Sequence, residues 1–152
     1  MRVIVQRINH GKCLVDGKII SEVGKGLLLL VGFTHKDDFD EIDKMAKKIA
    51  NLRIFEDDNQ KMNLNIKDVN GQILSVSQFT VYANPYTGNR PSFMDAMHPK
   101  VAKTLYERFN KIMNETYGIV TKPGIFGADM KLDIECDGPV TISLEFEEKP
   151  YE

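Results

Sequence analysis

The sequence predicts an α+β fold, with one domain over residues 1–152 in which mainly antiparallel sheets form a barrel-like core beside two principal helices. Three observations predict this fold. The length suits one compact domain, and strand patterns outnumber helical ones. The two segments with helical spacing lie between strand patterns without a regular alternation, which argues against a doubly wound parallel sheet.

The N-terminal part of the chain is predicted to form strands. Residues 1–8 are rich in β-branched side chains, which favour a strand. Residues 12–15 and 18–21 flank Asp16-Gly17, a dipeptide that suits the positive φ angles of a type I′ hairpin turn. Residues 27–33 are continuously apolar, which is typical of a strand buried on both faces.

Two helices are predicted from apolar residues at steps of three and four. The first begins after Asp37-Asp38, because acidic residues suit a helix N-terminus. Its apolar stripe consists of Phe39, Ile42, Met45, Ala46, Ile49 and Leu52. The second follows Pro99 and stops by Gly118. Its stripe consists of Val101, Ala102, Leu105, Phe109, Ile112 and Met113.

The remaining segments are predicted to be strands and loops. Residues 52–55 are expected to be extended and residues 84–91 to form a loop. Residues 72–79 alternate in the manner of a strand. Two further strands, 129–136 and 141–146, are predicted on either side of Asp137-Gly138-Pro139.

Composition limits the classes of function. No apolar run approaches the ~20 residues that span a bilayer, and the N-terminus lacks the features of a signal peptide. A cytoplasmic protein without a membrane partner is therefore expected. The net charge of −2 argues against an extensive nucleic-acid footprint. It is compatible with a protein that holds only the end of an RNA.

No metal or cofactor is expected. Cys13 and Cys136 lie far apart in sequence and are interpreted as two buried small hydrophobic residues rather than a disulfide or metal pair. His10, His35 and His98 form no ligand motif.

Familiar side-chain catalysts are absent from the sequence. It contains no GxSxG elbow, P-loop or GxGxxG motif. The pairs Asp57-Asp58 and Glu147-Glu148 are interpreted as solvated carboxylates. Any reaction must therefore use backbone donors, hydroxyl groups and the substrate itself.

Two segments are candidates for a site. Ser77-Gln78-Phe79-Thr80 places a dense polar group at the end of an apolar strand, although the same residues also fit an ordinary strand end. Gly138-Pro139 fits a plain turn, and it also fits a cis peptide whose two carbonyls point the same way.

Two more segments leave both a structural and a functional interpretation open. In residues 123–130, glycines flank Phe126, which fits either core packing or the stacking of a base. In residues 89–93, Arg90 is either a loop cation or a phosphate contact.

Together these segments resemble the D-aminoacyl-tRNA deacylase family nearly from end to end. The matching segments are Val5-Gln6-Arg7, Lys25 to Leu28, Leu52 to Asp57, Lys61-Met62-Asn63, Val76 to Thr80, Gly88 to Phe93, Phe126 to Met130 and Asp137 to Thr141. Two departures are Cys136, where the family usually has Asn, and Val81, where it usually has Leu. Cys136 affects a local hydrogen bond and Val81 affects packing.

The resemblance implies a homodimeric hydrolase that cleaves the ester bond of D-aminoacyl-tRNA at the 3′ end and rejects the L form. It implies that Gly138-Pro139 is cis, enters the partner's active site and selects chirality, and that Arg7 supports this segment across the interface. Phe126 and Met130 would flank the terminal adenine. Cleavage of glycyl-tRNA mischarged on tRNA(Ala), a proofreading reaction, is also expected.

The expected chemistry combines both lines of reasoning. Backbone N–H groups at Phe79 and Thr80, with Gln78 nearby, would form an oxyanion hole, and Ser77 would contact the substrate. Thr80 has no base beside it in sequence, which favours a positioning role over a nucleophilic one. Two rivals stay open: an editing module that removes L-amino acids, and a dimeric binding protein without catalysis. DNA is not expected as a partner.

Overall fold

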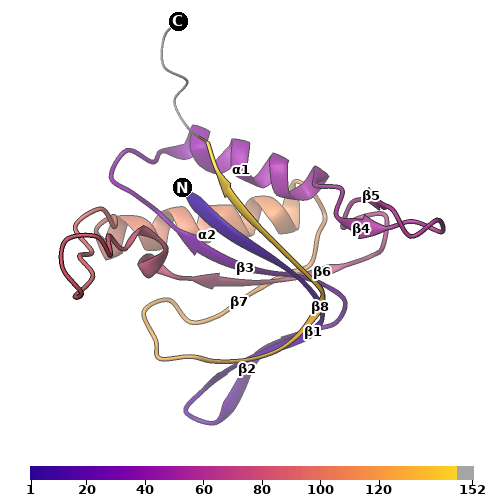
Figure 1. Ribbon diagram of the computed structural model, residues 1–152, viewed down its shortest axis with the longest axis horizontal. Coiled ribbons are helices and arrows are strands. Elements are labelled where there is room, and N and C mark those ends of the chain that lie inside the picture. Colours follow the sequence, from indigo (N-terminus) through magenta and orange to yellow (C-terminus); the bar gives the residue numbers. More distant parts are fainter. Residues whose placement is uncertain (147–152) are drawn as a thin grey trace, which may run out of the picture.

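A computed structural model describes residues 1–146 and contains a curved sheet with two helices on one side of it (Figure 1). The strands are β1 (Arg2–Val15), β2 (Lys18–Val23), β3 (Gly26–Gly32), β4 (Phe55–Glu56), β5 (Met62–Leu64), β6 (Gln72–Ser77), β7 (Thr121–Pro123) and β8 (Lys131–Glu145). The helices are α1 (Phe39–Asn51) and α2 (Pro99–Glu115), with a 3-10 helix, η1 (Phe79–Tyr82), after β6. The α+β class is confirmed.

The main sheet is mainly antiparallel, as predicted, and it also contains two parallel pairings. Its order is β2-β1-β3-β6-β7, and β8 pairs with β1 on the side away from this path. The pairings of β1 with β2, β3 and β8 are antiparallel, whereas β3–β6 and β6–β7 are parallel. The connection from β3 to β6 carries α1, the kind of crossover that parallel neighbours require.

The two edges of this sheet meet, which gives the barrel-like core. The side chain of Ser21 on β2 donates to the carbonyl of Pro123 on β7. Lys122 Nζ reaches the carbonyl of Glu22 at 2.9 Å. Strands β2 and β7 stand at opposite ends of the sheet order, so these contacts nearly close it.

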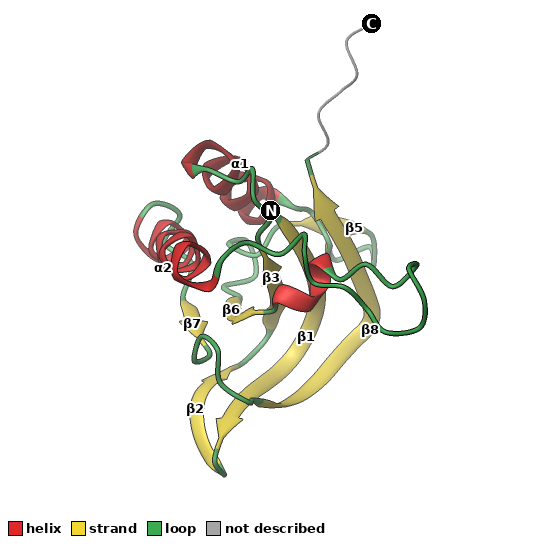
Figure 2. Cartoon of the chain, turned by 90° about the vertical axis from the view of Figure 1, so that its left-hand side faces the viewer, coloured by secondary structure: helices red, strands yellow, loops and turns green. Residues whose placement is uncertain are grey.

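The helices cover one face of the sheet, as Figure 2 shows. The core between them and the sheet contains fully buried side chains from β1, β3, α1 and α2, such as Val5, Leu29, Ile49 and Phe109. A smaller cluster around Ile8, Cys13 and Leu74 fills the other face. No helix within residues 1–146 is long and apolar enough to cross a membrane.

Local sequence signals place the helix starts. Asp38 caps α1, because its side chain accepts hydrogen bonds from Asp40 N at 3.0 Å and Glu41 N at 3.2 Å. Pro99 occupies the first turn of α2, where its missing N–H costs nothing, and His98 is the cap. Two predicted stripe residues are exposed instead of buried: Phe39 lies under the Arg108 guanidinium at 4.3 Å, and Val101 faces outward.

Several predicted strand boundaries were wrong. Arg2–Val15 is one strand rather than two, and Lys131–Glu145 runs straight through Gly138-Pro139. These two long strands pair along nearly their whole length, with register shifts near Ile8, so each keeps the other extended. Phe79 leaves the strand and begins η1. The short strands β5 and β7 carry no alternation long enough to predict them.

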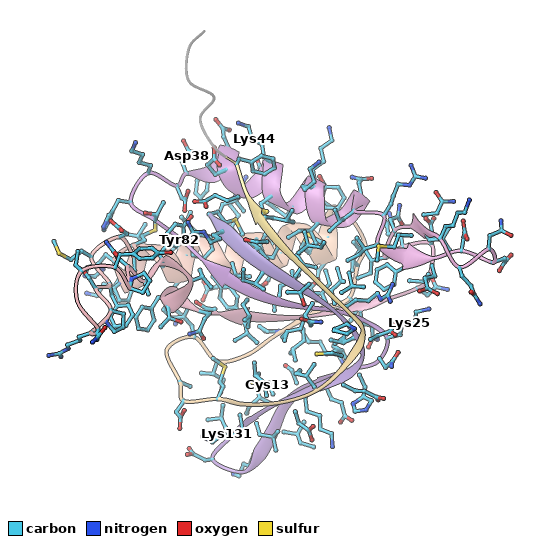
Figure 3. All side chains as sticks on the ribbon, viewed as in Figure 1. Cys13, Lys25, Asp38, Lys44, Tyr82 and Lys131 are labelled. Atoms are coloured by element: carbon cyan, nitrogen blue, oxygen red, sulfur yellow. The ribbon has the colours of Figure 1, made fainter. Side chains whose placement is uncertain are left out.

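The cysteines do not both behave as predicted. Cys13, labelled in Figure 3, is buried, and burial raises the pKa of its thiol. Cys136 is exposed, contrary to the prediction, because it lies on β8 beside the register shift. Both thiols are free.

Candidate active site

A cavity of about 580 Å³ opens at the carboxyl ends of the parallel strands β3 and β6. Ligands commonly bind at this edge of parallel strands, because the loops that follow the strands converge there. Its walls come from the end of β3, the end of β6 with η1, the start of α2, and the segment 126–132. The lining includes Gly32, Phe33, Ser77, Gln78, Phe79, Phe93, Met97, His98, Phe126 and Met130.

A glycine allows the floor of the cavity to form. A Cβ built on Gly32 would lie 2.0 Å from Val81 Cγ2 and 3.0 Å from the carbonyl oxygen of Gln78. Only a residue without a Cβ lets η1 pack this closely on β3. The backbone N–H of Gln78 also donates to the carbonyl of Val31 at 2.7 Å, which fixes the chain as it leaves β6.

The backbone N–H groups of Phe79 and Thr80, at the start of η1, are two unpaired donors among the described residues. The later N–H groups of η1 are already used: Val81 N donates to the carbonyl of Gln78 at 3.3 Å, and Ala83 N donates to that of Thr80 at 3.0 Å. Within residues 1–146, neither a backbone nor a side-chain acceptor pairs with the N–H groups of Phe79 and Thr80. The first N–H groups of a helix lack internal partners. These two are therefore available to a negatively charged oxygen.

The hydroxyl of Thr80 accepts a hydrogen bond from Gln78 Nε2. Gln78 lines the cavity, whereas Thr80 does not line it and is connected to it through this contact with Gln78. Within the part of the chain that the structure describes, no His, Asp, Glu or Lys side chain hydrogen-bonds the Thr80 hydroxyl. The site thus offers Thr80 no general base in contact.

The far end of η1 is anchored in the protein. Tyr82, labelled in Figure 3, donates to Glu145 Oε1 at 3.3 Å. Burial, aided by the charges of Asp37 and Glu145, raises the pKa of this phenol well above its usual range. Arg2 lies 4.6 Å from the ring centre and donates to the carbonyl of Val81. These contacts hold η1 at one end while its other end faces the cavity.

Apolar side chains form two walls of the cavity. Phe126 and Met130 line one of them, and the Phe126 ring packs 6.0 Å from that of Tyr106. A Cβ on Gly124 would lie 2.6 Å from Met130 Sδ, so the glycine leaves room for the methionine. Phe79 and Phe93 meet edge to face on the other wall, with ring centres 5.1 Å apart.

Few charges line the cavity. Asp129 is almost fully exposed and lies 3.9 Å from Lys131. His98 uses Nδ1 to accept from Lys100 N at 3.3 Å, and its Nε2 has no hydrogen-bond partner within residues 1–146. Over residues 1–146, no three His, Cys, Asp or Glu side chains gather in a way that would hold a metal ion.

Gly138 and Pro139 lie apart from this cavity. Their peptide bond is cis, the φ angle of Gly138 is +115°, and both residues are exposed on β8. They interrupt the pairing with β1, which ends at Cys136 and resumes at Thr141. Neither residue lines the cavity of its own chain.

Arg7 supports this segment within the same chain. Its side chain is buried on β1. Its Nε lies 3.3 Å from the Asp137 carbonyl and 3.2 Å from the Asp137 carboxylate, and its Nη1 donates to the Ile54 carbonyl at 2.8 Å. A Cβ on Gly138 would lie 3.0 Å from Arg7 Nη2. Arg7 therefore holds Asp137-Gly138 in place.

The structure brings together part of the predicted site. Ser77, Gln78, Phe79, Phe126 and Met130 line one cavity, whereas Thr80 does not line it and contacts Gln78. Sequence reasoning did not assign Phe93, Met97 and His98 to the site. Pro99 was a usable signal for His98, because a residue before a first-turn proline stands at a helix N-terminus. Glu147 and Glu148 lie outside the described residues.

Comparison with known proteins decides the family. A family model described as D-Tyr-tRNA(Tyr) deacylase matches residues 4–145. The chain belongs to this deacylase family. The deacylases are hydrolases that act on ester bonds, so the chain is an enzyme of that class.

Relatives match the deacylase chain over nearly its whole length. A D-aminoacyl-tRNA deacylase of Lactobacillus acidophilus is 55% identical and covers 95% of this chain and 99% of that protein. One of Fusobacterium nucleatum is 50% identical, covering 95% of each. A solved structure described as c-Myc DNA Unwinding Element Binding Protein is 39% identical, with a TM-score of 0.92 over 97% of this chain and all of that one.

A more distant structure shares the deacylase fold. It is described as a probable eukaryotic D-amino acid tRNA deacylase and is 18% identical. Its TM-score is 0.82 over 94% of this chain and 97% of that one. At this level of identity the likeness concerns the fold alone.

Proposed function

We propose that this deacylase hydrolyses the ester that joins a D-amino acid to the 3′-terminal adenosine of tRNA, releasing the free amino acid and the tRNA. The observation that carries the proposal is the cavity itself. Phe79, whose backbone N–H has no acceptor within residues 1–146, lines this cavity together with the apolar side chains of Phe126 and Met130. An unpaired N–H group suits a developing oxyanion, and an apolar wall suits the flat face of a base.

In the proposed reaction, water adds to the ester carbonyl carbon and the carbonyl oxygen becomes negatively charged. The N–H groups of Phe79 and Thr80 then donate to this oxygen, and each such donor is worth ~3 kcal/mol in the transition state. The bond to the ribose 3′-oxygen breaks, and that oxygen takes up a proton. The vicinal 2′-hydroxyl of the substrate helps to activate the water.

Thr80 acts in this scheme as a positioning group, because its hydroxyl contacts Gln78 and, among residues 1–146, no base. A threonine hydroxyl without a base is a poor nucleophile at neutral pH. Trapping of an acyl-Thr80 species, with Thr80→Ala still binding substrate but inactive, would make it the nucleophile instead.

Chiral selection is assigned to Gly138-Pro139 of a partner subunit in a homodimer. Both residues are exposed and lie outside the cavity of their own chain, which supports a role at another subunit's site. Their carbonyls would hold the α-ammonium group. A D side chain then points to solvent, whereas an L side chain strikes the Gly-Pro segment. Arg7 supports the segment from within its own chain.

One assay tests the proposed function. D-Tyr-tRNA and L-Tyr-tRNA are incubated with the protein in the cytoplasmic pH range, and deacylation is followed over time. Cleavage of the D form alone is expected. Cleavage of the L form would indicate an editing module for L-amino acids. Cleavage of neither would favour a binding protein, the type of function that the description of the 39% identical structure names.

Glycyl-tRNA is expected to be cleaved as well, including tRNA(Ala) mischarged with glycine. Exclusion by a clash at Cβ cannot act on glycine, which has no Cβ. The measurement is deacylation of Gly-tRNA across a range of enzyme concentrations, with L-Ala-tRNA as the matched control that differs by one methyl group. Gly-tRNA that survives at concentrations sufficient for D-Tyr-tRNA would contradict steric exclusion.

A further inference from the structure

The loop between η1 and α2 exposes large apolar side chains beside the cavity. Tyr86 is 91% exposed and Met94 is 83% exposed. The loop lies at the left of Figure 1, at the opposite end of the molecule from β4 and β5. Side chains of this kind that gather near a cavity commonly mark an interaction surface.

Hydrogen bonds hold this loop at its base. Asn84 and Ser92 pair through both backbone groups, at 2.7 and 2.9 Å. The side chain of Asn84 accepts from Tyr86 N at 2.9 Å, and His35 Nε2 lies 2.6 Å from the Met94 carbonyl. The exposed side chains therefore stand on an anchored loop.

The loop continues into the cavity wall. Phe93 follows Ser92 directly, lines the cavity and packs edge to face on Phe79. A chain whose last nucleotide occupies the cavity would pass this aromatic pair as it leaves toward Tyr86. The loop is thus a continuous extension of the proposed substrate site.

Charge indicates what binds this surface. Residues 69–94 contain no Asp or Glu, although the chain has 22 acidic residues among 152. Arg90 lies on the loop, is exposed, and is within ion-pairing distance of no carboxylate in the described part of the chain. Residues 84–92 of the loop carry an exposed tyrosine, one cation and no carboxylate, which suits a polyanion with flat bases; the exposed Asp95 follows this segment.

We propose that this loop, residues 84–92, is a platform for the unpaired nucleotides that precede the terminal adenosine of the substrate. Tyr86 stacks on a base and Arg90 contacts a phosphate. The proposal rests on the proposed function, because it assumes an RNA substrate whose 3′ end enters the cavity. It is compatible with the net charge of −2, since residues 84–92 themselves contain no Asp or Glu.

Two substrates test this platform. D-Tyr-tRNA contains the unpaired nucleotides, whereas 3′-O-(D-tyrosyl)adenosine lacks them and fills only the cavity. For Tyr86→Ala we expect KM to rise about tenfold on D-Tyr-tRNA, with kcat unchanged, because one stacked base is worth roughly that factor. On the short ester, KM should match that of the unchanged protein. Tyr86→Phe should retain KM on both substrates.

A binding measurement reports on the loop without catalysis. A fluorescein-labelled single-stranded RNA ending in CCA is titrated with each protein at several salt concentrations. Arg90→Ala should weaken binding and lower the slope of log K against log salt by about 0.7, as expected for one lost phosphate contact on a single strand. Met62→Ala, which removes an exposed side chain on β5, is the control and should change nothing.

The outcomes separate this proposal from the proposed function. An unchanged KM of Tyr86→Ala on D-Tyr-tRNA, or an equal rise on both substrates, overturns the platform while leaving the deacylase activity intact. Light scattering that shows a changed oligomeric mass for Tyr86→Ala overturns it in favour of a surface that binds a second copy of the chain. Failure of the unchanged protein to cleave either substrate rejects the proposed function and the platform together.

Discussion

Replacing Gly32 with alanine should lower kcat/KM for D-Tyr-tRNA about 100-fold while the protein stays folded. The added Cβ would lie 2.0 Å from Val81 Cγ2 and 3.0 Å from the Gln78 carbonyl oxygen, so η1 must shift away from β3. A shift of about 1 Å in a positioning element can cost on the order of 100-fold in rate. Overpacking of this kind lowers stability by about 1–3 kcal/mol, which a domain of this size tolerates.

Two variants control for this effect. Gly24→Ala adds the same atom where nothing lies within 4 Å, and it should leave kcat/KM unchanged. The double variant Gly32→Ala with Val81→Ala removes the closest clash and should recover part of the rate, although the contact with the Gln78 carbonyl persists. Activity of Gly32→Ala at the level of the unchanged protein would show that η1 does not position the reaction.

Arg7→Met should lower the free energy of unfolding by about 3 kcal/mol. The buried guanidinium donates to the carbonyls of Ile54 and Asp137, and both acceptors lose a charged donor in the variant. The estimate is at the low end for a buried ion pair, because the Asp137 and Glu56 carboxylates are partly exposed and water hydrates them. Urea denaturation at a fixed protein concentration measures the change.

Arg53→Met is the matched control for this variant. Arg53 makes its hydrogen bonds to Asn63 at the exposed surface, so its loss should cost less than 1 kcal/mol. In conditions where Arg7→Met is folded, we also expect it to cleave D-Tyr-tRNA more slowly, because Asp137-Gly138 loses its anchor. Equal stability of the two variants would mean that the Arg7 contacts contribute little.

The elements predicted correctly are those whose conformation depends on residues only a few positions apart in the sequence. Asp16 and Gly17 both have positive φ angles, as the hairpin prediction requires. The helix start after Asp38 follows from a capping side chain two and three residues away from its partners. Such signals span one turn, so the sequence carries them without reference to the rest of the fold.

The pairing of distant segments was not predictable in the same way. The parallel pairing of β3 with β6 joins Leu29 to Ser75, and that of β6 with β7 joins Ile73 to Thr121. Register between such segments depends on which faces are buried together, which alternation within one strand does not specify. For the same reason the long pairing of β1 with β8 turned four expected strands into two.

The sequence by itself, through its resemblance to a known family, predicted these residues of the candidate site: Ser77 to Thr80, Phe126, Met130, Arg7 and Gly138-Pro139. The tertiary structure decided which of these residues line the cavity and which lie apart from it on β8. It gathers Ser77, Gln78 and Phe79 with Phe126 and Met130 around one cavity, and it leaves Gly138-Pro139 exposed on β8, held by Arg7. The physical reason is that residue type records local chemistry, whereas proximity depends on sheet pairing and helix packing between segments far apart in the chain.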